Sequence, residues 1–336
     1  MLLDRNGTAI LGAEQISALA LASGAPVQLD ADLRRLNRWQ VGGLADAVVT
    51  PQSAEAIGRV LGLVAEFNLP NIVLGDGSNV LFDDRGFRGV IIHITRAVSR
   101  CRINGQCVTV EAGAWVPSWI RGLGGRGLGG IEHAIGIPGT VGGLVMMNGG
   151  SLRMNIGQNI VRVRGYNKLG IPFERSADDC KFRYRGSTLQ DDNLVVTEVD
   201  FALSKTSPSA FRQRALEILS SRRRKFPKRW PNCGSVFLSD PAMYELIGPP
   251  GLAIEKVGLK GRRIGGAQIS PQHANFIVNL GQARTNDILQ LIYEARSAVQ
   301  EKTGFSMLAE VRYVSPDGMI CPAHEQAERW FGRKLS

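Results

Sequence analysis

The chain has few cysteines and histidines among its 336 residues, and neither kind is clustered. No Cys-x-x-Cys pair occurs, and the four histidines are far apart. Such spacing provides neither a disulfide framework nor the grouped ligands of a zinc site. We therefore expect no disulfide and no bound metal. The five cysteines are Cys101, Cys107, Cys180, Cys233 and Cys321.

Long apolar segments are also missing. No run of eighteen apolar residues occurs, so no segment is expected to cross a membrane. The N-terminus reads Met1-Leu2-Leu3-Asp4-Arg5, without the cationic and apolar regions of a signal peptide. We expect a cytoplasmic protein that does not insert into a membrane.

Acidic residues are outnumbered, and the formal net charge is +10. An excess of this size suits an anionic partner, whether nucleic acid or a nucleotide-like ligand. The densest basic run, at residues 222–229, follows a helical apolar pattern. It is read either as the solvated end of a helix, where cations complement the helix dipole, or as a site for small anions.

Glycine, in contrast, is abundant, at 40 residues, and it is clustered. The densest stretch runs through residues 136–150. Glycine-rich backbone loses much entropy on folding, and we expect this stretch to bury little apolar surface. Its amides can approach phosphate oxygens that a Cβ would hold away. The stretch therefore predicts a site for a phosphate-bearing cofactor.

A second glycine loop, Gly75-Asp76-Gly77-Ser78-Asn79, follows a short apolar strand at residues 71–74. It lacks the dinucleotide fingerprint, because Val80 replaces the third glycine and no acidic residue follows at the usual distance. Alone it is typical of a tight turn. Two such loops, each beside a strand, favour an extended dinucleotide such as FAD.

The apolar periodicity also predicts the regular elements. Residues 1–35 are read as a loosely specified extension with one short helix, and the chain after residue 322 as a polar, peripheral tail. Residues 45–74 read as a strand, a helix and a strand, which is a βαβ-like unit. The expected helices are 13–22, 51–65, 115–123, one from about 210, and 286–302; the expected strands are 45–50, 71–74, 90–92, 108–110, 161–163, 195–197, 264–269 and 309–313.

Three residues with reactive or charged side chains have ordinary interpretations when taken singly. Arg185 is either a surface residue or a guanidinium that holds a carboxylate. Ser235 follows a glycine but is not in a Gly-x-Ser-x-Gly elbow, which disfavours a serine hydrolase. Glu310 reads as an outward-facing residue of the last expected strand.

Together with the glycine loops, these residues occur in a familiar order. The chain resembles the UDP-N-acetylenolpyruvoylglucosamine reductase family from residue 37 to residue 312. The motifs that carry the resemblance are Asn37-Arg38-Trp39-Gln40-Val41-Gly42-Gly43, Leu74-Gly75-Asp76-Gly77-Ser78-Asn79, Gly136-Ile137-Pro138-Gly139-Thr140-Val141-Gly142-Gly143, Tyr184-Arg185-Gly186-Ser187, Gly234-Ser235-Val236-Phe237, Gly258-Leu259-Lys260-Gly261, His273-Ala274-Asn275-Phe276 and Glu310-Val311-Arg312.

The resemblance implies an α+β fold. A two-part FAD-binding domain of the vanillyl-alcohol-oxidase type would precede a C-terminal α+β substrate-binding domain. The implied boundaries are 1–35 for the extension, 36–98 and 99–205 for the two FAD-binding subdomains, 206–322 for the substrate-binding domain and 323–336 for the tail. FAD would be held without a covalent bond by Gly75, Gly77, Ser78, Asn79, Val80, Leu81, Gly136, Ile137, Pro138, Gly139, Thr140, Gly142, Gly143 and Asn148.

The resemblance also implies the reaction. NADPH, as co-substrate, would reduce the flavin, which would pass hydride to the enolpyruvyl ether of a UDP-sugar. Arg185 and Glu310 would stabilise the electron-rich carboxylate intermediate, and Ser235 would supply the proton. Lys225, Ser239 and Arg312 would contact the substrate. The chain is expected to act as a monomer that binds neither nucleic acid nor metal.

The chain departs from the family pattern at several places. Asn148-Gly149-Gly150-Ser151 replaces the usual Asn-Ala-Gly-Ala, and the segment after Phe237 is one residue longer, so Ser239 or Asp240 would replace a substrate-binding asparagine. The short segment after Ser187 fits the subclass without a tyrosine-bearing flap.

Two alternative functions remain open. One is an alcohol or hydroxy-acid oxidase of the same flavin-binding fold, which could attach flavin through His93 or His133. The other is a nucleic-acid-binding module using the basic run, with salt-sensitive binding and no flavin.

Overall fold

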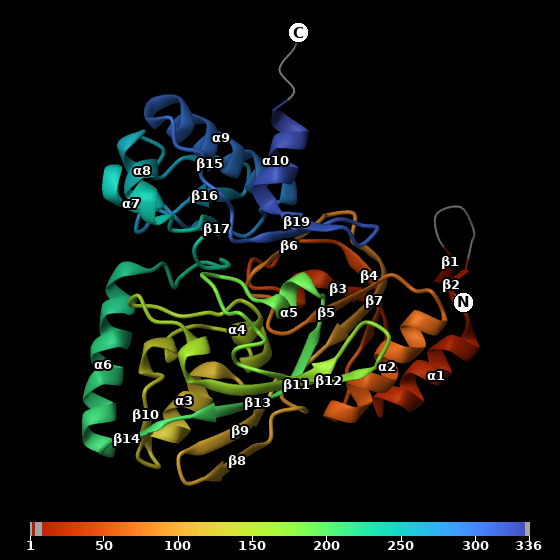
Figure 1. Ribbon diagram of the computed structural model, residues 1–336. Coiled ribbons are helices and arrows are strands. Elements are labelled where there is room, and N and C mark those ends of the chain that lie inside the picture. Colours follow the sequence, from red (N-terminus) through yellow and green to blue (C-terminus); the bar gives the residue numbers. More distant parts are fainter. Residues whose placement is uncertain (1, 4–8, 333–336) are drawn as a thin grey trace. The chain divides into compact units, whose positions relative to one another are not determined.

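The computed structural model describes residues 2–3 and 9–332 (Figure 1). Residues 1, 4–8 and 333–336, which belong to the expected extension and tail, lie outside the described residues. The chain forms two compact units. The first holds the described residues up to Asp30, Asp46–Asp76 and Gly89–Arg222, and the second holds Ala31–Ala45, Gly77–Arg88 and the described residues from Arg223. The second unit thus takes in two short segments from the N-terminal part of the chain.

The first unit is built mainly around two sheets. A four-stranded sheet has the order β3-β4-β7-β5, and a five-stranded antiparallel sheet has the order β12-β11-β13-β9-β8. Its strands are β1 (Leu2–Leu3), β2 (Ala9–Leu11), β3 (Gln28–Asp32), β4 (Leu44–Val49), β5 (Asn71–Leu74), β7 (Phe87–His93), β8 (Cys101–Asn104), β9 (Cys107–Glu111), β10 (Leu128–Gly129), β11 (Ile160–Tyr166), β12 (Pro172–Ser176), β13 (Val195–Ala202) and β14 (Ser204–Lys205), a few of which extend into the second unit. Its helices are α1 (Ala13–Ser23), α2 (Ala54–Glu66), α3 (Val116–Gly124), α4 (Val141–Met146), α5 (Thr188–Asp191), α6 (Pro208–Lys225) and the short 3-10 turns η2 (Glu132–Ala134) and η3 (Ile156–Asn159).

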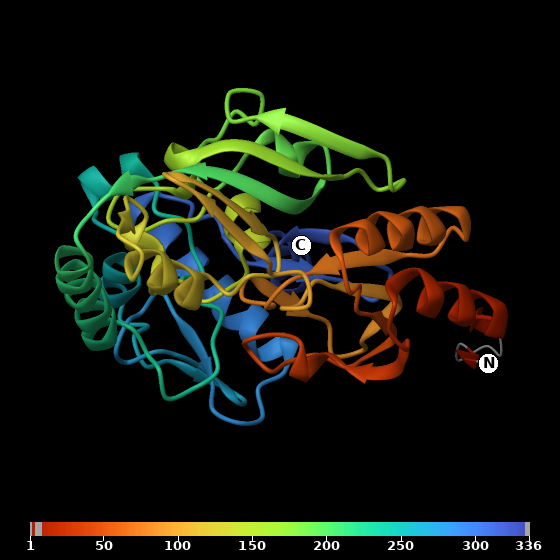
Figure 2. The same cartoon turned by 90° about the horizontal axis from the view of Figure 1, so that it is seen from below.

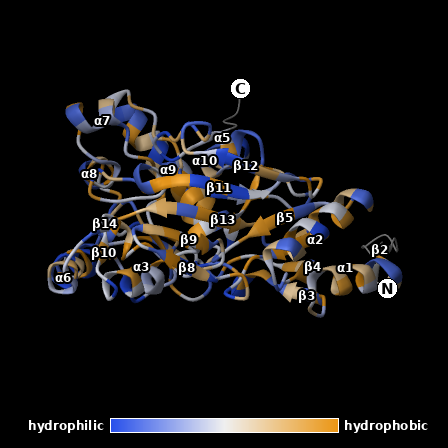
Figure 3. Cartoon of the chain, turned by 60° about the horizontal axis from the view of Figure 1, so that its bottom comes forward, coloured by the Kyte–Doolittle hydropathy of each residue, from blue (hydrophilic) through white to orange (hydrophobic). Residues whose placement is uncertain are grey.

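The expected strand, helix and strand are present as β4, α2 and β5. Helix α2 begins where the Ser53 hydroxyl accepts a hydrogen bond from the Ala56 amide at 3.2 Å, a common N-cap. Its apolar and polar residues form alternating bands of colour in Figure 3, and the apolar face is buried. Helix α1 lies beside α2 (Figure 2), and Leu19 is completely buried. Strand β7 lies between β4 and β5 and pairs with β5 in parallel.

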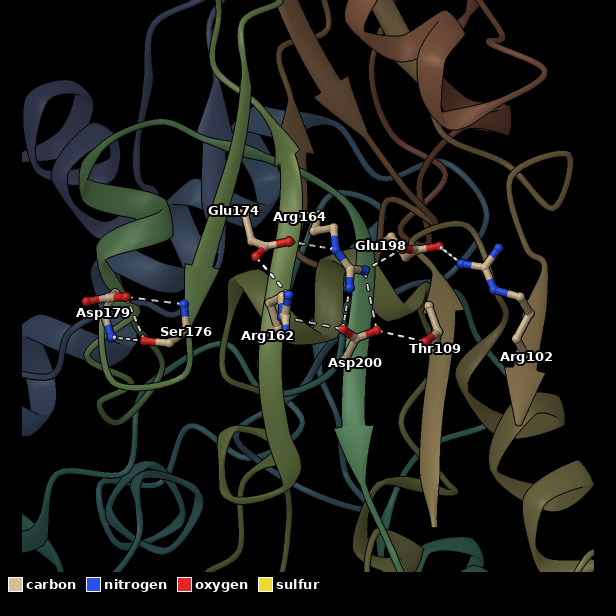
Figure 4. Close-up of polar contacts among 9 residues, drawn as sticks. All are labelled: Arg102, Thr109, Arg162, Arg164, Glu174, Ser176, Asp179, Glu198 and Asp200. Atoms are coloured by element: carbon tan, nitrogen blue, oxygen red, sulfur yellow. Dashed lines mark hydrogen bonds and ion pairs between the residues drawn. The ribbon is translucent and has the colours of Figure 1, made fainter. Parts of the chain in front are cut away.

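The five-stranded sheet has one apolar face and one charged face. Val163, Val199 and Phe201 are fully buried in the core of the first unit. On the other face Arg164 forms ion pairs with Glu174, Glu198 and Asp200, and Arg102 and Arg162 extend the network (Figure 4). The alternation follows from the two-residue period of a strand and orients the sheet with its apolar face inward.

The second unit has its own apolar core, which includes Trp39, Leu81 and Tyr313. Strand β18 lies between β19 and β6 and runs parallel to β6. The Tyr313 hydroxyl donates to a carboxylate oxygen of buried Asp83 at 2.5 Å, and Trp39 Nε1 donates to the Ile277 carbonyl at 2.7 Å. The elements of the second unit are η1 (Leu33–Arg35), β6 (Val80–Phe82), α7 (Pro241–Leu246), α8 (Pro250–Lys256), β15 (Arg263–Ile264), β16 (Ala267–Ile269), β17 (Ile277–Asn279), α9 (Thr285–Thr303), β18 (Arg312–Val314), β19 (Ile320–Pro322) and α10 (Ala323–Phe331).

Several sequence predictions of local structure are wrong. Residues 264–269 form the hairpin β15–β16 rather than one strand, because Gly265 takes a φ of +50° and reverses the chain. The last strand begins at Arg312, so Glu310 precedes it. The expected peripheral tail forms helix α10, whose buried Ala323 and Ala327 pack in the core. The glycine stretch was expected to bury little, yet it contains α4, and Val141 in this helix is fully buried.

Among the described residues, no helix is both long enough and apolar enough to cross a bilayer.

Candidate active site

The two glycine loops meet inside the first unit. Gly75 follows strand β5, and Thr140 precedes helix α4. A Cβ added at Gly75 would overlap the Thr140 hydroxyl oxygen, which shows how closely the backbone at Gly75 approaches the Thr140 side chain. Gly142 is held as closely, because an added Cβ would lie 2.8 Å from the Ala112 Cβ. The structure thus places two loops together that the sequence could only name separately.

The same place holds main-chain amides of the glycine stretch. Gly139 is buried and has a φ of +146°. The amides of Val141 and Gly142 donate to the carbonyls of Ala114 and Ala112, whereas those of Gly139 and Thr140 have no acceptor among residues 2–3 and 9–332. Free amides beside a close glycine contact are what the phosphates of a dinucleotide require, so the residues present fit FAD. Ile137, Pro138 and Gly143 complete this stretch.

The basic run begins against the same stretch. A Cβ added at Gly136 would overlap the Arg222 side chain, so glycine is needed there for packing within the protein. Burial lowers the pKa of Arg222 below that of a free guanidinium. Arg222 therefore packs on the glycine loop, whereas its neighbours Arg223 and Arg224 are exposed.

Arg185 lies in a tight turn of the first unit. Arg183 and Gly186 exchange two main-chain hydrogen bonds, and Arg185 takes a φ of +54°, which is unfavourable for a side chain with a Cβ. Arg185 Nη2 donates to the Gly150 carbonyl at 3.3 Å, and its guanidinium lies 5.3 Å from the Tyr184 ring centre. The turn holds the guanidinium next to the end of the glycine stretch.

Two side-chain amides fix this turn. Asn148 is buried: its Nδ2 donates to the Arg183 carbonyl and its Oδ1 accepts from the Gly157 amide, both at 2.9 Å. Gln190 donates to the Met146 carbonyl and, at 3.3 Å, to the Arg185 carbonyl. The Asn148 side chain, expected at the cofactor, is thus engaged within the protein. Gln190 was not foreseen, and no motif points to it.

The two histidines considered for covalent flavin attachment are both in the first unit. Burial lowers the pKa of His93, which lies close to Gly75 and Asp76. Burial also lowers the pKa of His133, whose two ring nitrogens are buried and have no hydrogen-bond partner among the described residues. Both imidazoles are therefore favoured in the neutral form.

Ser235 follows a turn of the second unit that hydrogen bonds hold in place. Directly before Ser235, Gly234 takes a φ of +80°, and its amide donates to the Asn232 side chain at 3.1 Å. The Cys233 thiol lies 3.5 Å from the Val80 carbonyl oxygen and 3.8 Å from that of Gly77. The Ser235 hydroxyl has no hydrogen-bond partner in the described part of the chain, so its proton is not committed within the protein.

Glu310 lies directly beside the Ser235 segment. Its amide donates to the Val236 carbonyl at 2.8 Å, and Phe237 bridges Ala309. The Glu310 carbonyl accepts from Asn79 Nδ2 at 3.1 Å. The second unit thus brings together Ser235, Glu310 and the loop residue Asn79.

The remaining predicted cofactor contacts of the second unit belong to the same region. Gly77 must be glycine for a packing reason, because its φ is +62° and an added Cβ would overlap the Leu36 carbonyl. Ser78 precedes Asn79, and Leu81 is buried in the core. Val80 pairs with Arg312 across β6 and β18, so Arg312 is near Glu310 along the chain and near Val80 across the sheet.

The predicted substrate contacts are dispersed in the second unit. Lys225 is exposed and, with Lys260, opposes protonation of His273, although burial is the main reason that the pKa of His273 is lowered. Ser239 is exposed. The Asp240 carboxylate accepts from the Ala242 amide at 2.8 Å and caps α7.

Two family models match separate parts of the chain. Residues 45–170 match a family model described as an FAD binding domain, and residues 226–314 match the C-terminal domain of UDP-N-acetylenolpyruvoylglucosamine reductase. UDP-N-acetylenolpyruvoylglucosamine reductase 1 of Corynebacterium glutamicum is 45% identical over 90% of this chain and 90% of its own length, and the reductase of Moorella thermoacetica is 37% identical over 88% and 97%. The crystal structure of the Thermus caldophilus reductase is 31% identical, with a TM-score of 0.72 over 85% of this chain and 97% of that one.

The fold and the site therefore define an FAD-dependent oxidoreductase with an α+β fold, as predicted. The chain belongs to the UDP-N-acetylenolpyruvoylglucosamine reductase family.

Proposed function

We propose that this chain uses NADPH and non-covalently bound FAD to reduce the enolpyruvyl ether of UDP-N-acetylglucosamine, giving UDP-N-acetylmuramate. Beyond family membership, one observation carries the proposal: Ser235 and Glu310, far apart in sequence, are joined through the hydrogen bond between the Glu310 amide and the Val236 carbonyl. A serine and a carboxylate-bearing residue on adjoining main-chain segments fit a reaction that must both stabilise a charge and deliver a proton.

FAD would be held in the first unit by Gly75, Thr140 and the free amides beside them. The chemistry that FAD supplies when bound is hydride transfer, from NADPH and then to the terminal carbon of the enolpyruvyl group. Gly75 and Gly142 have no Cβ, so the chain packs closely against Thr140 and Ala112 at these positions. This packing would hold the nearby amides in place for the phosphate oxygens.

Ser235 would then protonate the carbon beside the substrate carboxylate. Hydride at the terminal carbon leaves an electron pair at the neighbouring carbon, and the Ser235 hydroxyl proton forms the second new C–H bond. The turn at Gly234 presents this hydroxyl without an internal partner. A serine is a weak acid, so its conjugate base needs nearby donors to be stabilised.

Arg185 would neutralise the substrate carboxylate as charge develops on it. Its guanidinium has the planar geometry for bidentate binding, and its turn holds the backbone in an unfavourable conformation, as often found in functional sites. Glu310 would orient donors around the same carboxylate. Lys225, Ser239 and Arg312 would contact the rest of the substrate, of which Lys225 suits the diphosphate.

NADPH and UDP-sugars are intracellular metabolites, so we place the reaction in the cytoplasm. We propose that the chain acts as a monomer. Sedimentation of the FAD-bound protein, with and without substrate, tests this assignment.

An anaerobic visible spectrum tests the proposed function. NADPH should bleach the flavin band of the purified protein, and UDP-N-acetylglucosamine enolpyruvate should restore it. A flavin that is bleached but not restored would contradict the substrate and favour another oxidoreductase of this fold. A protein that neither retains nor takes up FAD would contradict the proposal as a whole.

A further inference from the structure

Asn275 makes an unusual set of hydrogen bonds to the segment that follows Ser235. Its side chain accepts from the Phe237 amide and donates to the Phe237 carbonyl, both at 2.9 Å. Its own carbonyl accepts from the Val236 amide, also at 2.9 Å. Asn275 is 4% exposed, so these bonds are shielded from water. Asn275 thus provides the hydrogen bonds that a neighbouring strand would otherwise make to Val236 and Phe237 on this side of the segment.

This clamp lies at the point where Ser235 and Glu310 are joined. The Val236 peptide bonds to Asn275 through its amide and to Glu310 through its carbonyl. The segment after Ser235 therefore has Asn275 on one side and Glu310 on the other. A shift of Val236 would move both Ser235 and Glu310, because each is connected to it directly.

We propose that Asn275 is a positioning residue for proton delivery: it fixes the main chain after Ser235, and so sets the place of the Ser235 hydroxyl relative to Glu310. The inference deepens the proposed function and rests on it. The effect is confined to the step in which Ser235 acts, the transfer to the enolpyruvyl substrate. Reduction of the flavin by NADPH does not use Ser235 and does not depend on Asn275.

Asn279 provides a matched control. It is also a buried asparagine, 3% exposed, four residues further along the chain. Its Nδ2 donates to the Trp39 carbonyl at 2.8 Å, and its Oδ1 accepts from the amides of Gly281 and Ala283 at 2.7 and 3.0 Å. Asn279→Ala thus removes a similar set of side-chain hydrogen bonds without touching Val236 or Phe237.

The experiment is a stopped-flow comparison of the two half-reactions in the FAD-bound proteins. In Asn275→Ala we expect reoxidation by UDP-N-acetylglucosamine enolpyruvate to slow by about 10²-fold, since small misplacements of reacting groups have effects of this size. Flavin reduction by NADPH should stay within about two-fold of wild type, and the solvent deuterium effect on reoxidation should increase as proton transfer becomes slower. In Asn279→Ala both half-reactions should match wild type.

Two further variants make the result decisive. Asn275→Asp retains the acceptor for the Phe237 amide but loses the donor to the Phe237 carbonyl, so it should slow reoxidation in the same way but by less. It serves as the test if Asn275→Ala does not fold. The double variant Ser235→Ala with Asn275→Ala should be no slower than Ser235→Ala alone, because Asn275 acts only through Ser235.

The outcomes distinguish this inference from the function on which it rests. If wild type is not reoxidised by the enolpyruvyl substrate, the proposed function is wrong and the role of Asn275 falls with it. If wild type reacts but Asn275→Ala matches it, or slows both half-reactions equally, Asn275 is merely structural and the proposed function stands. Additive losses in the double variant would also overturn the inference.

Discussion

An alanine at Gly75 would test the contact between the two glycine loops. The added Cβ would overlap the Thr140 hydroxyl oxygen but would lie 3.4 Å from Thr140 Cγ2 and 3.5 Å from Thr140 Cβ, which are ordinary contacts. Only one oxygen atom is therefore in the way. Thr140 is β-branched and its hydroxyl accepts from the Gly143 amide at 3.4 Å, so it cannot rotate away without losing the cap of α4.

The geometry gives the expected magnitudes. Gly75→Ala should lower the free energy of unfolding by about 1–3 kcal/mol, the usual range for overpacking. Thr140→Ala should lower it by about 0.5–1 kcal/mol, near the small end for a lost cap, because the capping bond is long. With Thr140→Ala already present, the Gly75→Ala change should have almost no further effect, since the offending oxygen is gone.

Urea unfolding of the four proteins in this cycle measures the coupling, and titration with FAD measures the cofactor affinity. We expect Gly75→Ala to weaken FAD binding and the double variant to recover part of it. Gly122→Ala in α3 is the control, because its Cβ would meet only Arg126 Nη1 at 3.7 Å, and alanine should stabilise that helix by up to about 1 kcal/mol. Equal losses from Gly75→Ala in both backgrounds would refute the contact.

Three further predictions concern single side chains. Ser235→Ala should retain FAD and its reduction by NADPH but slow reoxidation by the enolpyruvyl substrate about 10²–10⁴-fold; unchanged turnover would remove Ser235 as the acid. Arg185→Lys should keep FAD and raise the barrier of the same half-reaction, whereas loss of FAD would place Arg185 at the cofactor instead. Burial opposes ionisation of Asp83, but hydrogen bonds from Arg85 and Tyr313 hold its pKa below the usual value. Its contribution to stability is therefore present above about pH 4 and is lost as the pH falls below that value. In Asp83→Asn, the free energy of unfolding should depend less on pH in this range.

Much of the secondary structure could be predicted because local patterns specify it. The apolar residues of β5 and the Ser53 cap of α2 act within a few residues, and both elements occur where the sequence indicates them. The glycine loops are also visible, since glycine in such density is rare. What the sequence could not provide is their contact, because Gly75 and Thr140 are joined only through the tertiary structure of the first unit.

The failures have physical causes too. Helix α10 buries alanines, whose small side chains give little apolar signal, so the tail read as polar. Helix α4 packs through Val141, Leu144 and Val145, which lie between the glycines that drew attention to the loop. Local composition predicts an element poorly when a few small side chains carry its packing.

The glycines show why a glycine-rich sequence cannot be interpreted through a ligand alone. Gly75 and Gly142 are required because the Thr140 hydroxyl oxygen and the Ala112 Cβ occupy the space that a Cβ would need, and these contacts lie next to the amides of Gly139 and Thr140. Gly77 and Gly136 are required because Leu36 and Arg222 occupy the space that a Cβ would need, which is packing within the protein. Dense glycine therefore signals close approach of the chain to itself, and only the tertiary contacts show which of these approaches lie beside amides that suit a phosphate.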